Sequence, residues 1–255
     1  GVNDAPALAR ADVGVAMGIT GTEVAKSAAK IVITDDNFAT IVGAVQQGRV
    51  VYGNLQKVVL YLFATSVDEV LVLVLALVAG LPLPLAAVQI LWINIVTEGT
   101  LTVNLVMEPA DGDEMHRPPV PRDDRLLSST LLARTALMAL TSAAVTLGWF
   151  AWRLHQGADL DLARTEVFTL VAVCQWFNVL NCQSATASVI GPGLWRNRWL
   201  AGGLAAVLYV PAMNALFHTV PLPPAALLPL LGLASIVLWA EELRKVVARA
   251  RRRDP

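Results

Sequence analysis

The stretch Tyr61-Leu-Phe-Ala-Thr-Ser-Val-Asp-Glu69 leads directly into an almost pure Leu and Val run that ends at Gly80. A helix needs about 20 apolar residues to cross the roughly 30 Å of hydrocarbon in a bilayer. The run therefore predicts a membrane helix, although Asp68 and Glu69 lie inside it. A charged group near the bilayer centre costs about 2.5 kcal/mol or more, so such a carboxylate predicts a functional site with a cation as its partner.

The composition of the whole chain also indicates a membrane protein. Its 255 residues are 56% hydrophobic and 15% charged, and the mean hydropathy is +0.59. These values lie outside the usual range of soluble domains. Because backbone groups in lipid must be hydrogen bonded within their own segment, each long apolar stretch is expected to be a helix. The predicted spans are 60–80, 85–106, 130–153, 166–188, 198–219 and 224–243.

The positions of Lys and Arg predict the orientation in the membrane. With six spans, both termini and the second and fourth connections lie on the same side, and most of the basic residues near the span ends fall there. By the positive-inside rule that side is the cytoplasm, and we expect the plasma membrane. The partner implied is membrane lipid, and no nucleic acid is expected. The basic residues concerned are Arg49, Lys57, Arg117, Arg122, Arg125, Arg196, Arg198 and those of the tail 244–255.

The first 45 residues have the pattern of a soluble α/β unit. Residues 12–17 and 30–34 are short runs rich in β-branched residues and bounded by Gly or Asp, which is typical of buried parallel strands. Residues 21–29 between them predict a helix, which Thr20 or Thr22 could cap. A second helix is predicted to start at Phe38 and to run without Pro into the first membrane span. Such a helix would link the soluble unit mechanically to Glu69.

Helical spacing places oxygen-bearing side chains together in the first two spans. Ser66 and Glu69 are three residues apart, and Asn94, Thr97 and Glu98 are related by three and four, so each set shares one helix face. Two such faces packed together would offer carboxylate, amide and hydroxyl oxygens, which suit Ca²⁺, Mg²⁺ or Na⁺. The alternative is that Glu69 and Glu98 form a buried structural pair or are held protonated.

Several other polar residues in the spans need separate interpretations. Asp68 lies about 100° around the helix from Glu69, so it either faces another helix or supplies an extra ligand. Cys174 and Cys182 share one span without a metal-binding spacing, which predicts packing thiols. Arg134 falls near the start of a span, where we expect its side chain to reach the interface.

Four longer stretches carry a resemblance to a known family. They are GVNDAPAL at 1–8, ADVGVAMGITGTEVAKSAAKIVITDDNFATIVGAVQQGRVVYGN at 11–54, LPLPLAAVQILWINIVTEG at 81–99 and EPADGDEMHRPP at 108–119. In this order they resemble the C-terminal part of type II P-type cation-transporting ATPases of the calcium-pump kind.

The resemblance implies a mainly α fold in which a six-helix transmembrane bundle follows the C-terminal end of an α/β (HAD-like) phosphorylation domain. Residues 1–45 would be the end of that domain and 46–59 a stalk helix. Residues 60–243 would be the fifth to tenth membrane helices of the family, and 244–255 a basic cytoplasmic tail.

The resemblance also implies the positions of two sites. Asn3 and Asp4 match the family's pair at the phosphorylation site, where a donor and a carboxylate help to position phosphate and Mg²⁺. Departures from the calcium-pump pattern include a neutral side chain at the last ion-coordinating position, which predicts one bound ion rather than two. The ion-coordinating positions fall on Ser66, Glu69, Asn94, Thr97, Glu98 and Gln175.

The function implied is ATP-driven cation transport. Ca²⁺ is the expected cargo, with Na⁺, H⁺ or Mn²⁺ as alternatives, and the intact pump would use Mg²⁺ and ATP. The family's phosphorylated Asp, nucleotide-binding domain and first four membrane helices have no counterpart in this sequence. We therefore expect the chain alone not to hydrolyse ATP and to need the N-terminal half of the pump. A non-catalytic membrane fragment that associates with another pump remains an alternative. A passive transporter is the third class, which the phosphorylation-domain motif disfavours.

Overall fold

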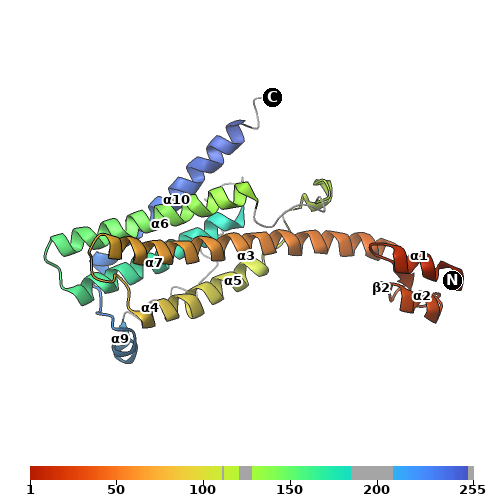
Figure 1. Cartoon of the computed structure of the whole chain (residues 1–255), viewed down its shortest axis with the longest axis horizontal. Coiled ribbons are helices and arrows are strands. Elements are labelled where there is room, and N and C mark those ends of the chain that lie inside the picture. The colour runs from red at the N-terminus through yellow and green to blue at the C-terminus, as the bar shows by residue number, and fades with distance from the viewer. Residues whose placement is uncertain (111, 121–127, 185–208, 252–255) are drawn as a thin grey trace. The chain divides into compact units, whose positions relative to one another are not determined.

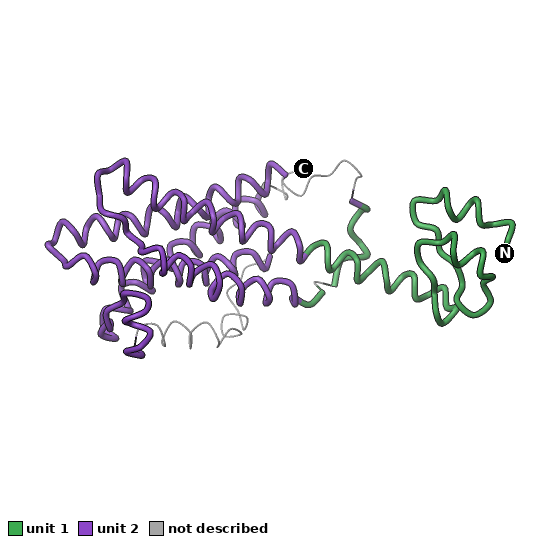
Figure 2. Tube along the Cα trace, turned by 60° about the horizontal axis from the view of Figure 1, so that its bottom comes forward, with its two compact units in different colours: residues 1–53, 109–119 green, residues 54–108, 120–255 purple. Residues whose placement is uncertain are grey.

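The computed structural model describes residues 1–110, 112–120, 128–184 and 209–251, and these residues are mainly helical (Figure 1). The chain forms two compact units (Figure 2). Unit 1 consists of residues 1–53 and 109–119, and unit 2 consists of residues 54–108 and 120–255. Parts of the predicted fourth and fifth spans, 185–188 and 198–208, lie outside the described residues, as do Arg122, Arg125, Arg196 and Arg198.

Unit 1 contains the predicted strands as a parallel pair, in which Val15 is in register with Ile31. The connecting helix is capped as expected, because the Thr22 hydroxyl accepts a hydrogen bond from the Ala25 amide at 3.3 Å. In chain order the elements are η1 (Val2–Asp4), α1 (Ala5–Arg10), β1 (Val15–Met17), α2 (Glu23–Ala28) and β2 (Ile31–Ile33).

Asp36 connects the turn after β2 to the loop after β1 through hydrogen bonds. Its carboxylate accepts hydrogen bonds from the Ile19 amide at 2.8 Å and from the Thr20 amide and hydroxyl at 2.6 Å each. The Thr20 hydroxyl and then the backbone amides lower the pKa of Asp36 from 3.8 to about 2. Gly21 belongs to the same loop, and a Cβ there would lie 2.0 Å from the Met17 carbonyl oxygen, so only glycine fits.

The helix predicted from Phe38 into the first span is α3 (Ala39–Val78). Its 40 residues correspond to a length of about 60 Å. Two residues after Val78, Gly80 has φ +69°, and the Leu81 amide donates to the Ala76 carbonyl at 2.9 Å. A left-handed glycine with such a bond is a common helix C-cap. The Pro-free stretch and the closing glycine together explain where this helix ends.

The part of α3 that belongs to unit 1 contacts the loop 109–119 of the same unit, which includes η3 (Glu114–His116). The Arg49 guanidinium donates to the carbonyl oxygens of Glu114 at 2.7 Å and Arg117 at 2.8 Å. In the same loop Arg117 forms an ion pair with Asp113.

Unit 2 is a bundle in which α6 (Ser129–His155), α7 (Leu160–Gln183) and α10 (Pro224–Arg251) pack against one another, and α5 (Gly99–Val106) contacts α7. One buried cluster joins α3, α5, α6 and α7 through Tyr61, Leu101, Met138 and Leu180, among others. A second cluster contains Trp92 and Phe168, whose ring centroids are 5.2 Å apart. The other helices of this unit that the structure describes are α4 (Ala87–Trp92), the π-helical segment η2 (Ile93–Glu98), α9 (Pro211–Phe217) and the end of α3.

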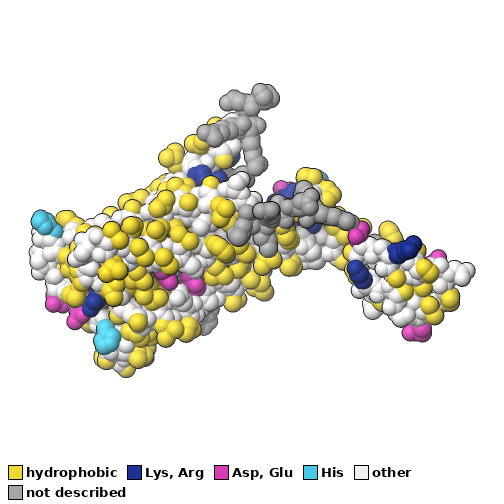
Figure 3. Space-filling model, viewed as in Figure 1, with side chains coloured by type: hydrophobic (Ala, Val, Ile, Leu, Met, Phe, Trp, Pro, Cys, Tyr) yellow, Lys and Arg dark blue, Asp and Glu magenta, His cyan; other side chains and the backbone are white. Residues whose placement is uncertain are grey.

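Three of the described helices, α3, α6 and α10, are long and apolar enough to cross a membrane. Their outer faces expose large apolar side chains such as Val78, Leu140 and Leu228. The space-filling view shows an extensive apolar surface on the helical part of the chain (Figure 3). Lipid-facing surfaces have this composition. The count of six spans stays a prediction.

The predicted span boundaries differ from the described helices in four places. In the fifth predicted span, the described part contains the short helix α9, which begins at Pro211 and ends at Phe217. The second predicted span is interrupted by η2, and α7 begins at Leu160 rather than at residue 166. α10 continues to Arg251, so most of the predicted tail 244–255 extends the last helix.

Candidate intramembrane ion site

The π-helical segment η2 carries three of the predicted ligands, Asn94, Thr97 and Glu98. π-helical turns are rare and occur frequently at functional sites, because their wider spacing re-aims side chains. The Thr100 hydroxyl donates to the carbonyl oxygens of Val96 at 2.6 Å and Thr97 at 3.2 Å. It thereby supplies side-chain hydrogen bonds to backbone groups of the irregular turn.

Glu69 of α3 faces both η2 and α7. Its side chain is 8% exposed, and Gln175 Nε2 donates to its Oε1 at 3.4 Å. The Asn94 amide also faces this carboxylate: with its nitrogen turned inward it would donate to the two oxygens at 3.0 and 3.2 Å. Glu69 thus lies among amide groups from two other helical segments, and carboxylate and amide oxygens are ligands that suit a hard cation.

Glu98 brings a second carboxylate to the same region. It is 9% exposed and close enough to Glu69 for electrostatic interaction. Within the described part of the chain, Glu98 Oε1, Thr97 Oγ1 and Gln175 Oε1 are buried without a hydrogen-bond partner. Buried polar atoms normally have partners, so these three atoms are available to a water molecule or to a bound ion. No ion pair to Glu69 or Glu98 is found among the described residues.

The structure does not place every predicted ligand equally. Glu69, Asn94 and Gln175 meet, and Thr97 and Glu98 lie buried on η2, whereas Ser66 is exposed on α3. Asn94 is also exposed, so this side of the site is open in the chain described here. The roles of all six residues as ligands stay predictions.

Asp68 faces a neighbouring helix, one of the two interpretations left open by the sequence. It is fully buried, and the Ser142 hydroxyl of α6 donates to its Oδ2 at 2.6 Å. Its Oδ1 has no hydrogen-bond partner among the described residues. Cys174 and Cys182 are buried free thiols.

Asn3 and Asp4 lie at the surface of unit 1, on η1 and at the start of α1. Asp4 forms an ion pair with the amino group of Gly1. One amide and one carboxylate fit a Mg²⁺ ion that takes its other ligands from phosphate, water and further protein groups. Within the described ranges no group of three or more His, Cys, Asp and Glu residues could hold a metal by itself.

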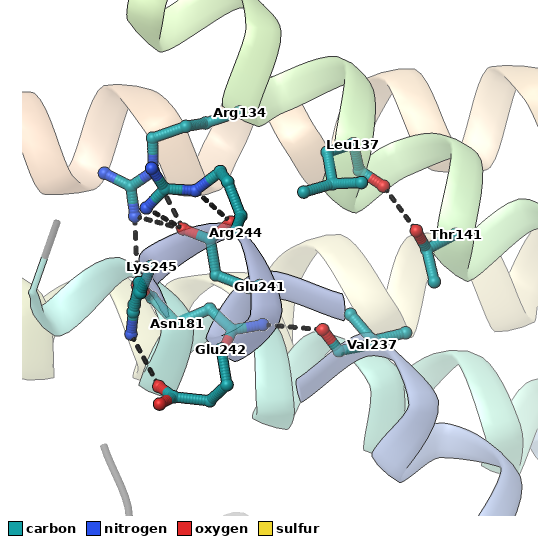
Figure 4. A network of polar contacts seen from close by, with 9 residues as sticks. All are labelled: Arg134, Leu137, Thr141, Asn181, Val237, Glu241, Glu242, Arg244 and Lys245. Carbon is teal, nitrogen blue, oxygen red and sulfur yellow. Dashed lines mark hydrogen bonds and ion pairs between the residues drawn. The ribbon is translucent and has the colours of Figure 1, made fainter. Parts of the chain in front are cut away.

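A charged network joins α6, α7 and α10, and the sequence analysis missed it (Figure 4). Arg134 is 8% exposed, and its Nε donates to Glu241 Oε1 at 2.9 Å. Its side chain therefore has a fully buried partner that the sequence analysis did not predict, and its place relative to the membrane interface stays a prediction. Arg134 also donates to the Asn181 carbonyl at 3.1 Å, and Arg244 Nε donates to Glu241 Oε2 at 2.7 Å.

The same network continues along α10. Lys245, which is also fully buried, donates to Glu242 Oε1 at 3.0 Å, and the Asn181 amide donates to the Val237 carbonyl at 3.1 Å. The spacing of three between each Glu and its partner on α10 is a signal that the sequence contains.

A further ion pair, between Arg153 and Glu166, connects α6 to α7. Glu166 is 4% exposed, and its two oxygens accept hydrogen bonds from Arg153 at 2.6 and 2.9 Å. The Trp149 indole donates to the same carboxylate at 3.0 Å. The Arg153 guanidinium carbon lies 6.0 Å from the Trp149 ring centroid and 5.9 Å from that of Trp152. Such contacts add cation–π attraction to the ion pair.

Long apolar helices that enclose carboxylates define the chain as part of a membrane protein. A sequence model of the family described as "Cation transporting ATPase, C-terminus" matches residues 82–247. The chain therefore belongs to the P-type cation-transporting ATPases and corresponds to their C-terminal part.

Individual relatives agree with this assignment. The chain is 40% identical over 262 aligned positions to the "Probable cation-transporting ATPase F" of Mycobacterium tuberculosis, covering 100% of this chain and 29% of that protein. It is 37% identical to the "Calcium-transporting ATPase" of Bacillus subtilis, with 92% of this chain and 27% of the relative covered. It is 38% identical to the "Calcium-transporting ATPase type 2C member 2" of Mus musculus, with 96% of this chain and 27% of that relative covered. The chain thus spans less than a third of these relatives.

Proposed function

We propose that this chain provides the membrane ion site of an ATP-driven cation pump and that the transported ion is Ca²⁺. The observation that carries the proposal is the convergence of Glu69, Asn94 and Gln175 from three helical segments, with Glu98 nearby. Among the described residues, no side-chain cation is paired with either carboxylate. Relatives with calcium transport in their names support the choice of ion.

The chemistry of the side chains fits a hard cation. Carboxylate, amide and hydroxyl oxygens are the ligands that Ca²⁺ prefers, whereas Zn²⁺ and copper prefer nitrogen or sulfur. Glu69 and Glu98 carry two negative charges, which would neutralise one divalent ion. Gln175 contributes only a neutral carbonyl oxygen, so we propose that the chain binds one ion rather than two. Ser66 and Thr97 would add hydroxyl ligands.

The remaining features of the proposal concern the intact pump. Its phosphorylation would use Mg²⁺ and ATP, with Asn3 and Asp4 at the edge of that site. The N-terminal half would be the partner, and this chain alone would not hydrolyse ATP. Six spans with both termini in the cytoplasm and a plasma-membrane location complete the proposal. Label from γ-labelled ATP should not enter the purified chain, and incorporation would contradict this part.

Equilibrium binding of radioactive Ca²⁺ to the chain in lipid nanodiscs tests the ion site. We expect saturable binding of about one ion per chain, since the donor set supplies charge for one divalent ion. Glu69→Gln or Glu98→Gln should abolish it, whereas Glu23→Gln, a change of an exposed carboxylate in unit 1, should not. Competition by Mn²⁺ or Na⁺ would identify another cargo. A parent chain without saturable binding, or variants that bind as the parent does, would contradict the assignment.

A further inference from the structure

Asp68 is a buried carboxyl that the proposed ion site does not use. It directly precedes Glu69 in the first predicted span. Asp68 and Ser142, whose hydroxyl donates to it, are both fully buried. The Cys174 thiol of α7 lies beside both of them. One hydroxyl and one thiol do not make a cage for a hard cation, because such ions require several oxygen ligands.

The two neighbouring carboxyls point in different directions and contact different helices. Consecutive side chains are about 100° apart around a helix. Glu69 therefore meets Asn94 of η2 and Gln175 of α7, while Asp68 meets Ser142 of α6. At this level α3 makes polar contacts with three different segments of unit 2.

These contacts limit the rotation of α3 about its own axis. Any turn that moves Glu69 away from Asn94 also separates Asp68 from Ser142. The separation would leave a buried carboxyl without its hydroxyl partner, which is unfavourable in an apolar surrounding. We propose that the Asp68–Ser142 hydrogen bond sets the angle of α3 and so positions the Glu69 carboxylate for the ion. Asp68 is thus a positioning residue and not a ligand.

Chemical cross-linking of paired cysteines tests the angle of α3 without any ion. The pair Glu69→Cys with Asn94→Cys, in a background with Cys174→Ala and Cys182→Ala, reports through a short thiol-specific cross-linker whether the two positions face each other. Asp68→Leu should slow the cross-linking of this pair several-fold, whereas Asp68→Asn keeps an acceptor oxygen and should not. A control pair, Arg153→Cys with Glu166→Cys, should be cross-linked at an unchanged rate in every variant and thereby exclude general unfolding. An unchanged rate for the 69/94 pair in Asp68→Leu would overturn the proposal.

Measurements of Ca²⁺ affinity distinguish a positioning residue from a ligand. This second experiment rests on the proposed function. With the native Glu69 and Asn94, Asp68→Leu and Ser142→Ala should each raise the Kd by a similar factor with unchanged stoichiometry. The double variant should be no worse, since both changes remove one contact. The exchange Asp68→Ser with Ser142→Asp should restore affinity. If Asp68→Asn lost most of its Ca²⁺ affinity while Ser142→Ala bound Ca²⁺ as tightly as the parent, Asp68 would be a ligand, and the proposal would be overturned. If even the parent binds no Ca²⁺, the proposed function fails, and cross-linking alone decides the role of Asp68.

Discussion

Unit 2 contains two kinds of buried glutamate, and they differ in their partners. Glu241 and Glu166 each accept hydrogen bonds from an arginine at both carboxylate oxygens. Glu69 and Glu98 have no ion pair within the described chain, and Glu69 contacts amides instead. All four are at most 9% exposed. Burial therefore does not distinguish a structural carboxylate from a candidate ligand, whereas the presence of an arginine does.

The difference has opposite consequences for stability. A carboxylate paired with arginine is neutralised in place, and removing it strands a buried cation. Two carboxylates near each other without a cation repel, and the chain is stabilised when an ion binds between them. Substitutions of the two kinds should therefore differ in their response to Ca²⁺ as well as in size.

The largest expected effect is that of Glu241→Gln. The change leaves Arg134 buried without its carboxylate and weakens the contact of Arg244 with the same group. Breaking a buried ion pair costs about 3 to 5 kcal/mol, so the free energy of unfolding in detergent should fall by that amount. The loss should be the same with Ca²⁺ and with chelator. A loss no larger than that of the exposed control Glu23→Gln would remove the distinction between the two kinds of glutamate.

Glu69→Gln should abolish a stabilisation that depends on the ion. At a Ca²⁺ concentration of 100 times the Kd, a ligand that binds only the folded state stabilises it by about 2.7 kcal/mol. The parent should show this increase in the free energy of unfolding, and the variant should show none. In chelator the variant should be at least as stable as the parent, because an unpaired buried carboxylate is removed. The measurement is denaturant unfolding with and without Ca²⁺, and a Ca²⁺ response equal to the parent's would count against the site.

Glu166→Gln should have a smaller effect than Glu241→Gln. Glutamine can still accept from Trp149, and Arg153, whose side chain is 22% exposed, can turn partly to solvent. We expect a loss of about 1.5 kcal/mol, typical of one hydrogen bond to a charged group. Arg153→Lys should lose a similar amount, since lysine cannot form the two-point contact. Unfolding of the two variants and of their combination would show whether both changes act on one pair.

The smallest effect concerns Asp36 in unit 1, which lies outside the bundle. Its pKa is lowered from 3.8 to about 2, first by the Thr20 hydroxyl and then by backbone amides. A lowered pKa in the folded state means stability that is present above pH 4 and is lost as the pH falls towards 2. Asp36→Asn should remove this acid sensitivity, and Thr20→Val should move the pKa of Asp36 back towards 3.8. NMR titration of the carboxyl group measures both, and a normal pKa in the parent would contradict the geometry.

Local signals in the sequence were sufficient for much of the fold. The Pro-free stretch after Phe38 and the glycine at position 80 predicted α3 to within two residues. The β-branched runs and Thr22 predicted β1, β2 and the cap of α2. These features depend on residues close together in the chain. Helical spacing also predicted that Glu69 and Asn94 would face a common site.

Features that depend on distant partners were not predicted. The π-helical register of η2 has no clear sequence signal, since its hydrogen bonds compete with those of an ordinary α-helix. The pairing of Arg134 with Glu241 was not predicted, because the two residues are 107 positions apart and local spacing does not connect them. Ser66 shares the helical spacing of Glu69 but is exposed, so spacing alone did not decide which face of α3 is covered.

The Arg153–Glu166 pair also bears on how the chain enters the membrane during synthesis. The two residues are 13 positions apart, on helices joined by a short turn, whereas Arg134 and Glu241 are 107 apart. The α6–α7 hairpin can therefore neutralise its own charges as soon as α7 has left the ribosome, and it can insert as one unit. Arg134 can form its ion pair only after α10, which carries Glu241, has been synthesised. A nascent chain arrested before α10 should thus hold the hairpin inserted, and Glu166→Gln should reduce that insertion.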